Sequence, residues 1–124
     1  MILTIDERWL LDVAQTHLPG DPDVIDYGSL AAAVARHRHE VMGHLVYAEA
    51  HHRAAALLQQ LVRVPALEHS NELFAATVAA AYLHASGRPV KVATDVAADL
   101  VEQAAAGHLD VREIAGRLRG WTQE

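Results

Sequence analysis

The sequence of 124 residues contains no cysteine, which excludes disulfide bonds, a thiol nucleophile and any zinc site built on thiolates. Basic residues are also in short supply, since ten of them stand against sixteen acidic ones and the formal net charge is −6. A protein that holds nucleic acid by its phosphate backbone needs a basic face. We therefore expect no nucleic-acid partner.

Long apolar runs are absent as well. No stretch reaches the roughly 18 residues that a membrane-spanning helix needs. Residues 1–7 lack the basic start and the apolar run of a signal peptide. These absences predict a cytoplasmic protein that does not bind membranes.

Glycine and proline are scarce, at seven and four residues, whereas 52% of the chain is hydrophobic and 24 residues are alanine. Alanine favours helices because its side chain loses no entropy there. The composition excludes an all-β sandwich, and it excludes a disordered chain, which would need low hydrophobicity and high net charge. The length fits one domain, so we predict a single domain spanning residues 1–124.

Capping residues and apolar spacing predict an all-α compact bundle of five to six helices. The caps that we expect are the Thr4 and Glu7 capping box, Asp26, Ser70, Thr94, and the Asp110 and Glu113 capping box. The first predicted helix runs from the Thr4 and Glu7 capping box to about residue 17. The other predicted helices cover about residues 27–41, 49–64, 71–86, 95–106 and 110–119.

The helix at about 71–86 is the most distinctive element. It carries no charge from Leu73 through Leu83, and Gly87 follows it as a C-terminal cap. A helix that is apolar on every face is buried on every face. We therefore expect this helix to be the buried centre of the bundle. Gly43 is expected to end the second helix, and residues 43–48 form either a loop or a short turn.

Histidines are unusually frequent between residues 37 and 52. The stretch contains His37, His39, Glu40, His44, His51 and His52. Two histidines on a helix share a metal when they stand three or four residues apart, and no pair in this stretch has that spacing. We expect no metal site and interpret these side chains as solvated or half-buried, while a catalytic base among them stays an alternative.

The turn at residues 65–72 precedes the expected central helix. Glu68, His69, Ser70 and Asn71 place an acid, a base, a hydroxyl and an amide side by side. The free N–H groups and the dipole at a helix start attract anions. A purely structural interpretation is equally available, in which Ser70 caps the helix, Asn71 satisfies the loop and the acidic side chains complement the dipole.

This arrangement resembles the Fic/Doc superfamily, and most of all the Doc toxins of Phd–Doc toxin–antitoxin modules. The resemblance covers most of the chain and implies the same helical fold. It is carried by an Asn-led apolar helix that ends in glycine, by the two helices before it, and by the segments after it. These are residues 71–87, 27–41, 54–64, 98–100, 104–111, 114–115 and 118–119.

In that family the motif loop reads His-x-Phe-x-Asp/Glu-x-Asn-Lys-Arg. The histidine is the general base, the acid binds Mg²⁺, and the Asn, the cations and the helix start hold nucleotide phosphates. The family transfers AMP or, for Doc toxins, a phosphate from a nucleotide to a protein, which for Doc toxins is elongation factor Tu, and translation stops. With Asn71 aligned on the motif asparagine, the histidine position falls on Pro65, the phenylalanine position on Leu67 and the acid position on His69. The two cation positions fall on Glu72 and Leu73.

In this alignment the position of the general base is Pro65, which has no proton-accepting side chain. Glu72 and Leu73 stand where the family has two cations. A like charge about 4 Å away costs about 4 kcal/mol at an effective dielectric near 20, whereas a helix dipole returns about 0.3–1 kcal/mol. Arg53 and Arg63 are the candidates to restore a cation. We therefore expect a toxin-type protein that acts by binding, with no cofactor. The resemblance implies a small antitoxin as its partner and a translation factor as a possible second one.

Two alternatives remain open. A rewired transferase or hydrolase would use His69 with Glu68 or Asn71, and would need ATP and Mg²⁺ for phosphoryl or nucleotidyl transfer. A structural or regulatory homodimer would use the alanine-rich helices, which permit close packing between chains.

Overall fold

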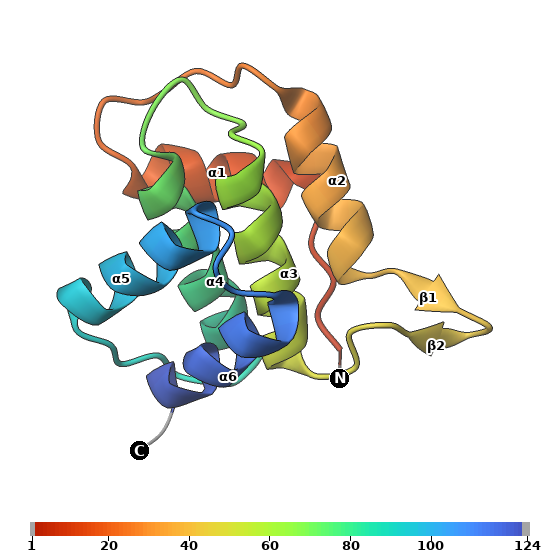
Figure 1. The fold of residues 1–124 in the computed structure, drawn as a ribbon. Helices are drawn as coiled ribbons and strands as arrows, with labels where there is room; N and C mark the ends of the chain where they lie inside the picture. The colour runs from red at the N-terminus through yellow and green to blue at the C-terminus, as the bar shows by residue number, and fades with distance from the viewer. Residues whose placement is uncertain (1, 123–124) are drawn as a thin grey trace.

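The computed structural model describes residues 2–122, and in these residues six helices and one small hairpin form a compact bundle (Figure 1). The all-α prediction is confirmed. In chain order the elements are α1 (Glu7–His17), α2 (Tyr27–His37), β1 (Glu40–Val41), β2 (His44–Leu45), α3 (Ala50–Arg63), α4 (Asn71–Ala85), α5 (Thr94–Ala105) and α6 (Val111–Trp121).

The predicted capping box of Thr4 and Glu7 is wrong. The N-cap of α1 is Asp6, whose carboxylate accepts a hydrogen bond of 2.9 Å from the backbone N–H of Trp9. The helix therefore starts at Glu7, and the preceding residues are left free to enter the core, where Ile5 is buried. An aspartate at this position satisfies one of the unpaired N–H groups at the helix start.

The other predicted caps have mixed outcomes. Asp26 caps α2, and Asp110 with Glu113 forms a complete capping box at α6. Thr94 does not cap α5, because it is the first helical residue and Ala93 holds the cap position. Residues 95–105 are helical in either case, so the error moves the boundary by one residue.

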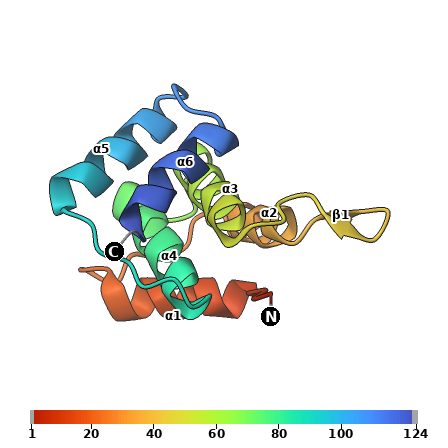
Figure 2. The ribbon, with the colours of Figure 1, turned by 90° about the horizontal axis from the view of Figure 1, so that it is seen from below.

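The helix predicted for residues 27–41 is wrong beyond His37. The chain instead forms an antiparallel hairpin in which Val41 lies opposite His44. Met42 and Gly43 make the two-residue turn with φ of 52° and 81°, the positive values that such turns require. Gly43 therefore allows a reversal of the chain and does not end a helix. Figure 2 shows the hairpin projecting from the bundle beyond α2.

The core is organised around α3, which packs against α2, α4, α5 and α6. Nine of its 14 residues are buried, compared with six of the 15 in α4. The expectation that α4 is buried on every side is met only in part, because Leu73 remains 47% exposed and several small residues are half-buried. An alanine-rich helix has low polarity, but small apolar side chains can also lie at the surface, so low polarity does not require burial on every face.

A buried cation links four segments of this core. The side chain of Arg53 on α3 is 4% exposed. Its Nε donates to the hydroxyl of Tyr82 at 2.7 Å, and its Nη1 donates to the carbonyl oxygens of Tyr47 and Ala48 at 3.1 and 2.8 Å. The Tyr82 hydroxyl donates in turn to the carbonyl oxygen of Leu3 at 2.6 Å. Arg53 thus ties α4, the return from the hairpin and the N-terminal segment to α3.

His37 fixes the same N-terminal segment from α2. Its Nε2 accepts a hydrogen bond of 3.0 Å from the backbone N–H of Ile5, and its Nδ1 bonds to the carbonyl oxygen of Val34. The ring also meets the Tyr82 ring edge to face at 5.9 Å. Accepting at Nε2 requires the neutral ring with its proton on Nδ1. Burial lowers the pKa of His37, because the protonated ring would be poorly solvated.

Replacing Tyr82 with phenylalanine removes the acceptor for Arg53 and the donor for Leu3 while the ring stays in place. Buried polar groups that lose their partners are costly. We expect Tyr82→Phe to lower the free energy of unfolding by about 2–3 kcal/mol in urea titrations. Tyr27→Phe, at an exposed tyrosine, is the matched control and should change it by less than about 0.5 kcal/mol. Equal effects of the two variants would contradict a special role for Tyr82.

The neutral state of His37 predicts a dependence of stability on pH. In the unfolded chain the ring takes up a proton near its ordinary pKa of about 6.5, whereas the folded ring resists protonation. The free energy of unfolding should therefore be constant above about pH 7 and fall as the pH drops through 6.5. Urea titrations between pH 5 and 8 measure the slope, and His37→Gln should reduce it. His39→Gln, at an exposed histidine, should leave the slope as in the wild type.

Candidate functional site

The candidate loop at residues 65–70 connects α3 to α4 and is held from the side by the segment before α2. The carbonyl oxygen of Ala66 accepts hydrogen bonds from the N–H groups of Ile25 and Asp26 at 2.7 and 3.1 Å. The N–H of Glu68 donates to the carbonyl oxygen of Asp23 at 3.0 Å. Figure 1 shows the two connections side by side at one end of the bundle. The loop therefore has a fixed backbone.

Asn71 shapes this loop from inside. Its Oδ1 accepts hydrogen bonds from the N–H groups of Ala66 and Leu67 at 3.1 and 3.0 Å, and its Nδ2 donates to the carbonyl oxygen of Leu67 at 2.9 Å. Three of the four hydrogen bonds that an amide side chain can form are thus used within the loop. This is the structural role that the sequence left as one alternative for Asn71.

Ser70 holds the N-cap position of α4, but its side chain makes no capping hydrogen bond, so the predicted capping role of the hydroxyl is wrong. Its backbone is left-handed, with φ of 66°. The hydroxyl instead lies 2.8 Å from Nδ1 of His69. The His69 ring packs over Gly20, where a Cβ would lie 3.4 Å from the ring. A left-handed serine is strained, and such residues concentrate at functional sites.

Glu68 completes a row of three polar side chains. Its Oε1 accepts a hydrogen bond of 3.0 Å from the backbone N–H of Asp23 and lies 4.0 Å from Nε2 of His69. The side chains of Glu68 and His69 are 46% and 48% exposed. The row is therefore a surface feature, and the structure brings Glu68, His69 and Ser70 together as the sequence suggested.

The positions that would hold phosphates carry no cation. Glu72 and Leu73 are both exposed on the first turn of α4. Arg63 donates to the carbonyl oxygen of Ala105 at the end of α5. Arg53 lies at the opposite end of α3, which at 14 residues is about 21 Å long. Arg53 therefore lies away from the loop, whereas Arg63 stands two residues before the loop and is bonded to the end of α5, and its role as the missing cation stays a prediction.

The histidine-rich stretch divides into two kinds of residue. His37 and His51 are buried, in contrast to the expectation that all of these histidines are solvated or half-buried, whereas His39 and His44 are exposed. Nε2 of His51 lies 2.8 Å from the hydroxyl oxygen of Thr122. Within residues 2–122 no three histidine, aspartate or glutamate side chains are grouped as a metal site.

The buried cluster around Arg53 is not among the features that the sequence predicted. A signal was present, because Arg53 precedes Leu57 by four residues and Leu61 by eight, and so shares the apolar face of its helix. A charged residue on such a face is almost never buried without hydrogen-bonding partners. The pattern could therefore have identified Arg53 as the centre of a polar network.

Comparisons with known proteins give one relationship over nearly the full length. The chain is 36% identical over 119 residues to a protein named Toxin Doc from Mycolicibacterium smegmatis (strain ATCC 700084 / mc(2)155). The aligned region covers 94% of this chain and 92% of that relative. No family model matches the chain. Among residues 2–122, no helix combines the length and the hydropathy that a bilayer crossing requires.

The hydrogen bonds of Asn71 predict its effect on stability. Asn71→Ala removes all three bonds and leaves buried backbone groups of the loop unpaired, so we expect a loss of about 2–3 kcal/mol in urea titrations. Asn71→Asp keeps both accepted bonds and adds a favourable negative charge at a helix start, but its second oxygen faces the Leu67 carbonyl oxygen in place of the Nδ2 donor. It should therefore lose less than Asn71→Ala. If both variants match the wild type, Asn71 does not hold the loop.

Proposed function

Since the chain belongs to the Doc toxin family, we propose that it is the toxin-type component of a bacterial toxin–antitoxin pair, acting in the cytoplasm by binding another protein. The near-complete coverage of a relative named Toxin Doc supports the family role. The observation that carries the binding mode is the first turn of α4, where Glu72 and Leu73 replace two phosphate-binding cations. This loop is then a degenerate form of the Fic motif.

The residues present do not fit ATP with Mg²⁺. Pro65 has no proton-accepting side chain at the position of the general base, and Asn71 is committed to the loop. Glu68, which could replace the metal-binding acid, already accepts a hydrogen bond from Asp23. A triphosphate would meet the negative charges of Glu68 and Glu72 at the start of α4, where the two matched positions carry no cation. We therefore assign this loop no step through a nucleotide or a metal ion.

The surface beside the loop suits a protein partner. Ile25 and Tyr27 are 66% and 64% exposed, although both are large and apolar. A hollow of about 580 Å³ lies next to them between α1 and the following connection, and Asp12, Asp21 and Asp23 help to line it. Exposed apolar groups rimmed by charge are typical of interaction sites. A small antitoxin that offers basic and apolar side chains would fit, and a translation factor is the target that we propose for the free toxin.

One observation favours a second candidate, the rewired enzyme. His69 lies within hydrogen-bonding distance of the Ser70 hydroxyl, and Glu68 lies on the far side of the ring. A base beside a hydroxyl is the arrangement by which enzymes activate a nucleophile. Removal of the imidazole separates the two candidates, because binding through the surface does not need a proton acceptor. A homodimer remains a separate prediction, which light scattering at several concentrations tests.

Expression in a bacterial host tests the proposal. We expect induced wild-type protein to arrest growth, and co-expression of the small protein encoded by the neighbouring open reading frame to relieve the arrest and to co-purify with it. His69→Ala should arrest growth as strongly as the wild type. His84→Ala, at an exposed histidine on α4, is the matched control for expression level. Loss of arrest only in His69→Ala would favour the enzyme.

Calorimetric titration with ATP and Mg²⁺ provides the second readout. The loop repels phosphate and should contribute no saturable heat, so His69→Ala should leave any heat of ATP binding unchanged. The exposed pair Glu72→Lys and Leu73→Arg restores two cations at little cost in packing, and should bind ATP at least about tenfold more tightly. Micromolar binding of ATP that His69→Ala abolishes, or transfer of label from ATP to elongation factor Tu, would contradict the binding mode.

A further inference from the structure

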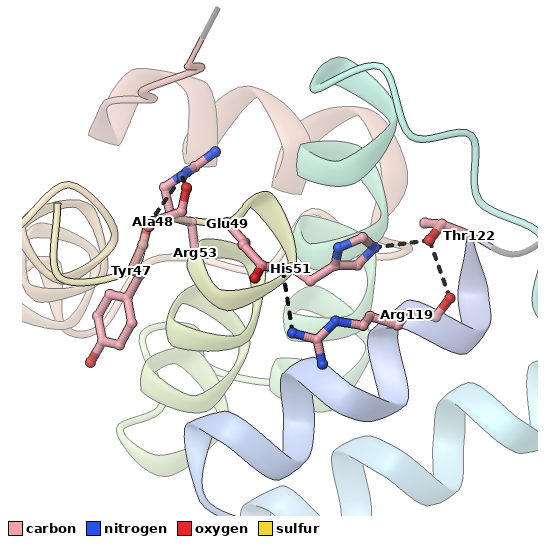
Figure 3. Close-up of polar contacts among 7 residues, drawn as sticks. All are labelled: Tyr47, Ala48, Glu49, His51, Arg53, Arg119 and Thr122. Carbon is pink, nitrogen blue, oxygen red and sulfur yellow. Dashed lines mark hydrogen bonds and ion pairs between the residues drawn. The ribbon is translucent and has the colours of Figure 1, made fainter.

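A second polar pocket lies at the opposite end of α3 from the candidate loop. Its volume is about 320 Å³, and it lies between the start of α3 and the end of α4. The residues that line it are Ala48, Glu49, Ala50, His51, Arg53, Ser86 and Arg88. Figure 3 shows the α3 side of this region. The pocket shares no residue with the loop at residues 65–72, so its chemistry is independent of the proposed function.

The floor of the pocket holds a buried positive charge. Arg53 uses Nε and Nη1 on neutral oxygens, those of Tyr82, Tyr47 and Ala48, and the structure gives its Nη2 no acceptor among residues 2–122. Within the same residues no carboxylate forms an ion pair with it. A buried guanidinium without a counter-ion is costly, and a bound anion would remove that cost.

The end of α4 adds a hydroxyl and a second cation. The Oγ atom of Ser86 is buried and has no hydrogen-bond partner in the described part of the chain. Buried polar atoms are nearly always paired, so an unpaired one beside a pocket points to a missing acceptor or donor. Gly87, with φ of 83°, turns the chain, and the N–H of Arg88 donates to the carbonyl oxygen of Leu83 at 2.9 Å. This turn places Arg88 at the pocket.

The start of α3 also favours an anion in the pocket. Its N-cap, Glu49, makes no side-chain capping bond to the helix. The Glu49 carboxylate points instead toward α6, where it accepts from Arg119 at 3.4 Å, as Figure 3 shows. The one acid that lines the pocket is thus paired elsewhere. The free N–H groups and the dipole at the start of a helix favour an anion.

The pKa of His51 reflects the positive charges near the pocket. It is bonded to Thr122 at Nε2, and its pKa is lowered first by burial and then by the positive charges of Arg88 and Arg119. Glu49 acts in the opposite direction and is the weaker influence. The region is therefore positive although the whole chain carries a net charge of −6.

We propose that this pocket binds the phosphate group of a small molecule, held by the guanidinium groups of Arg53 and Arg88, the Ser86 hydroxyl and the N-terminal N–H groups of α3. A phosphate carries a charge of about −1.5 to −2 at pH 7 and several acceptor oxygens, which matches two cations and a set of donors. A carboxylate offers one charge and two oxygens, so it uses this donor set less fully.

Calorimetric titration of the full chain with inorganic phosphate tests the proposal, with acetate and chloride at equal ionic strength as comparison anions. Phosphate should bind saturably with one site per chain, and acetate should bind more weakly. Arg88→Gln, at an exposed residue, should weaken phosphate at least about tenfold. Arg112→Gln removes the same charge from an exposed site on α6, so it should change the affinity less than about twofold.

Ser86→Ala separates binding from folding. Loss of an unpaired buried hydroxyl should leave the midpoint of thermal unfolding in phosphate-free buffer unchanged or higher. The same variant should weaken phosphate about fivefold, the effect of one lost hydrogen bond. The proposal is overturned if phosphate gives no saturable binding, if acetate binds equally well, or if Arg88→Gln and Arg112→Gln have the same effect. None of these outcomes bears on growth arrest.

Discussion

Arg53 carries a positive charge that is almost entirely withdrawn from water, and the surrounding elements are placed to supply its acceptors. α4 contributes the Tyr82 hydroxyl, and the return from the hairpin contributes two carbonyl oxygens. The N-terminal segment accepts the hydrogen bond that the Tyr82 hydroxyl donates. A buried guanidinium tolerates no loss of these partners, since charge in a low-dielectric interior must be compensated. The position of three segments relative to α3 thus follows from the solvation of one side chain.

The sequence predicted those features that depend on local chemistry. The capping box of Asp110 and Glu113, the left-handed Gly87 and the helix that begins at Asn71 each follow from a few neighbouring residues. The hairpin did not follow, because two strands of two residues are too short for an alternating pattern. The sequence also did not show that α3 is more buried than α4. Burial depends on which helices pack around each one, and this is a property of the whole fold.

The candidate site shows the same division. The sequence placed Glu68, His69, Ser70 and Asn71 in one turn, which is correct because they are consecutive. It left the role of Asn71 open, and only the structure shows that its amide is used by Ala66 and Leu67. The contacts of the two arginines could be known only from the fold, since Arg53 donates to Tyr82 on α4 and Arg63 donates to Ala105 on α5. The pocket at the start of α3 combines residues more than thirty positions apart, beyond the reach of any local pattern.

The two-way hydrogen bonds between Glu68 and Asp23 have a kinetic consequence. These residues are 45 positions apart in the chain, so their contact closes a long loop that contains α2, the hairpin and α3. The entropy of closing such a loop is lost before its few bonds are gained. Both Glu68 and Asp23 are exposed, and water competes for their bonds. These two surface bonds are therefore expected to form late in folding and to open easily, whereas the bonds to the carbonyl oxygen of the buried Ala66 keep the loop backbone in place.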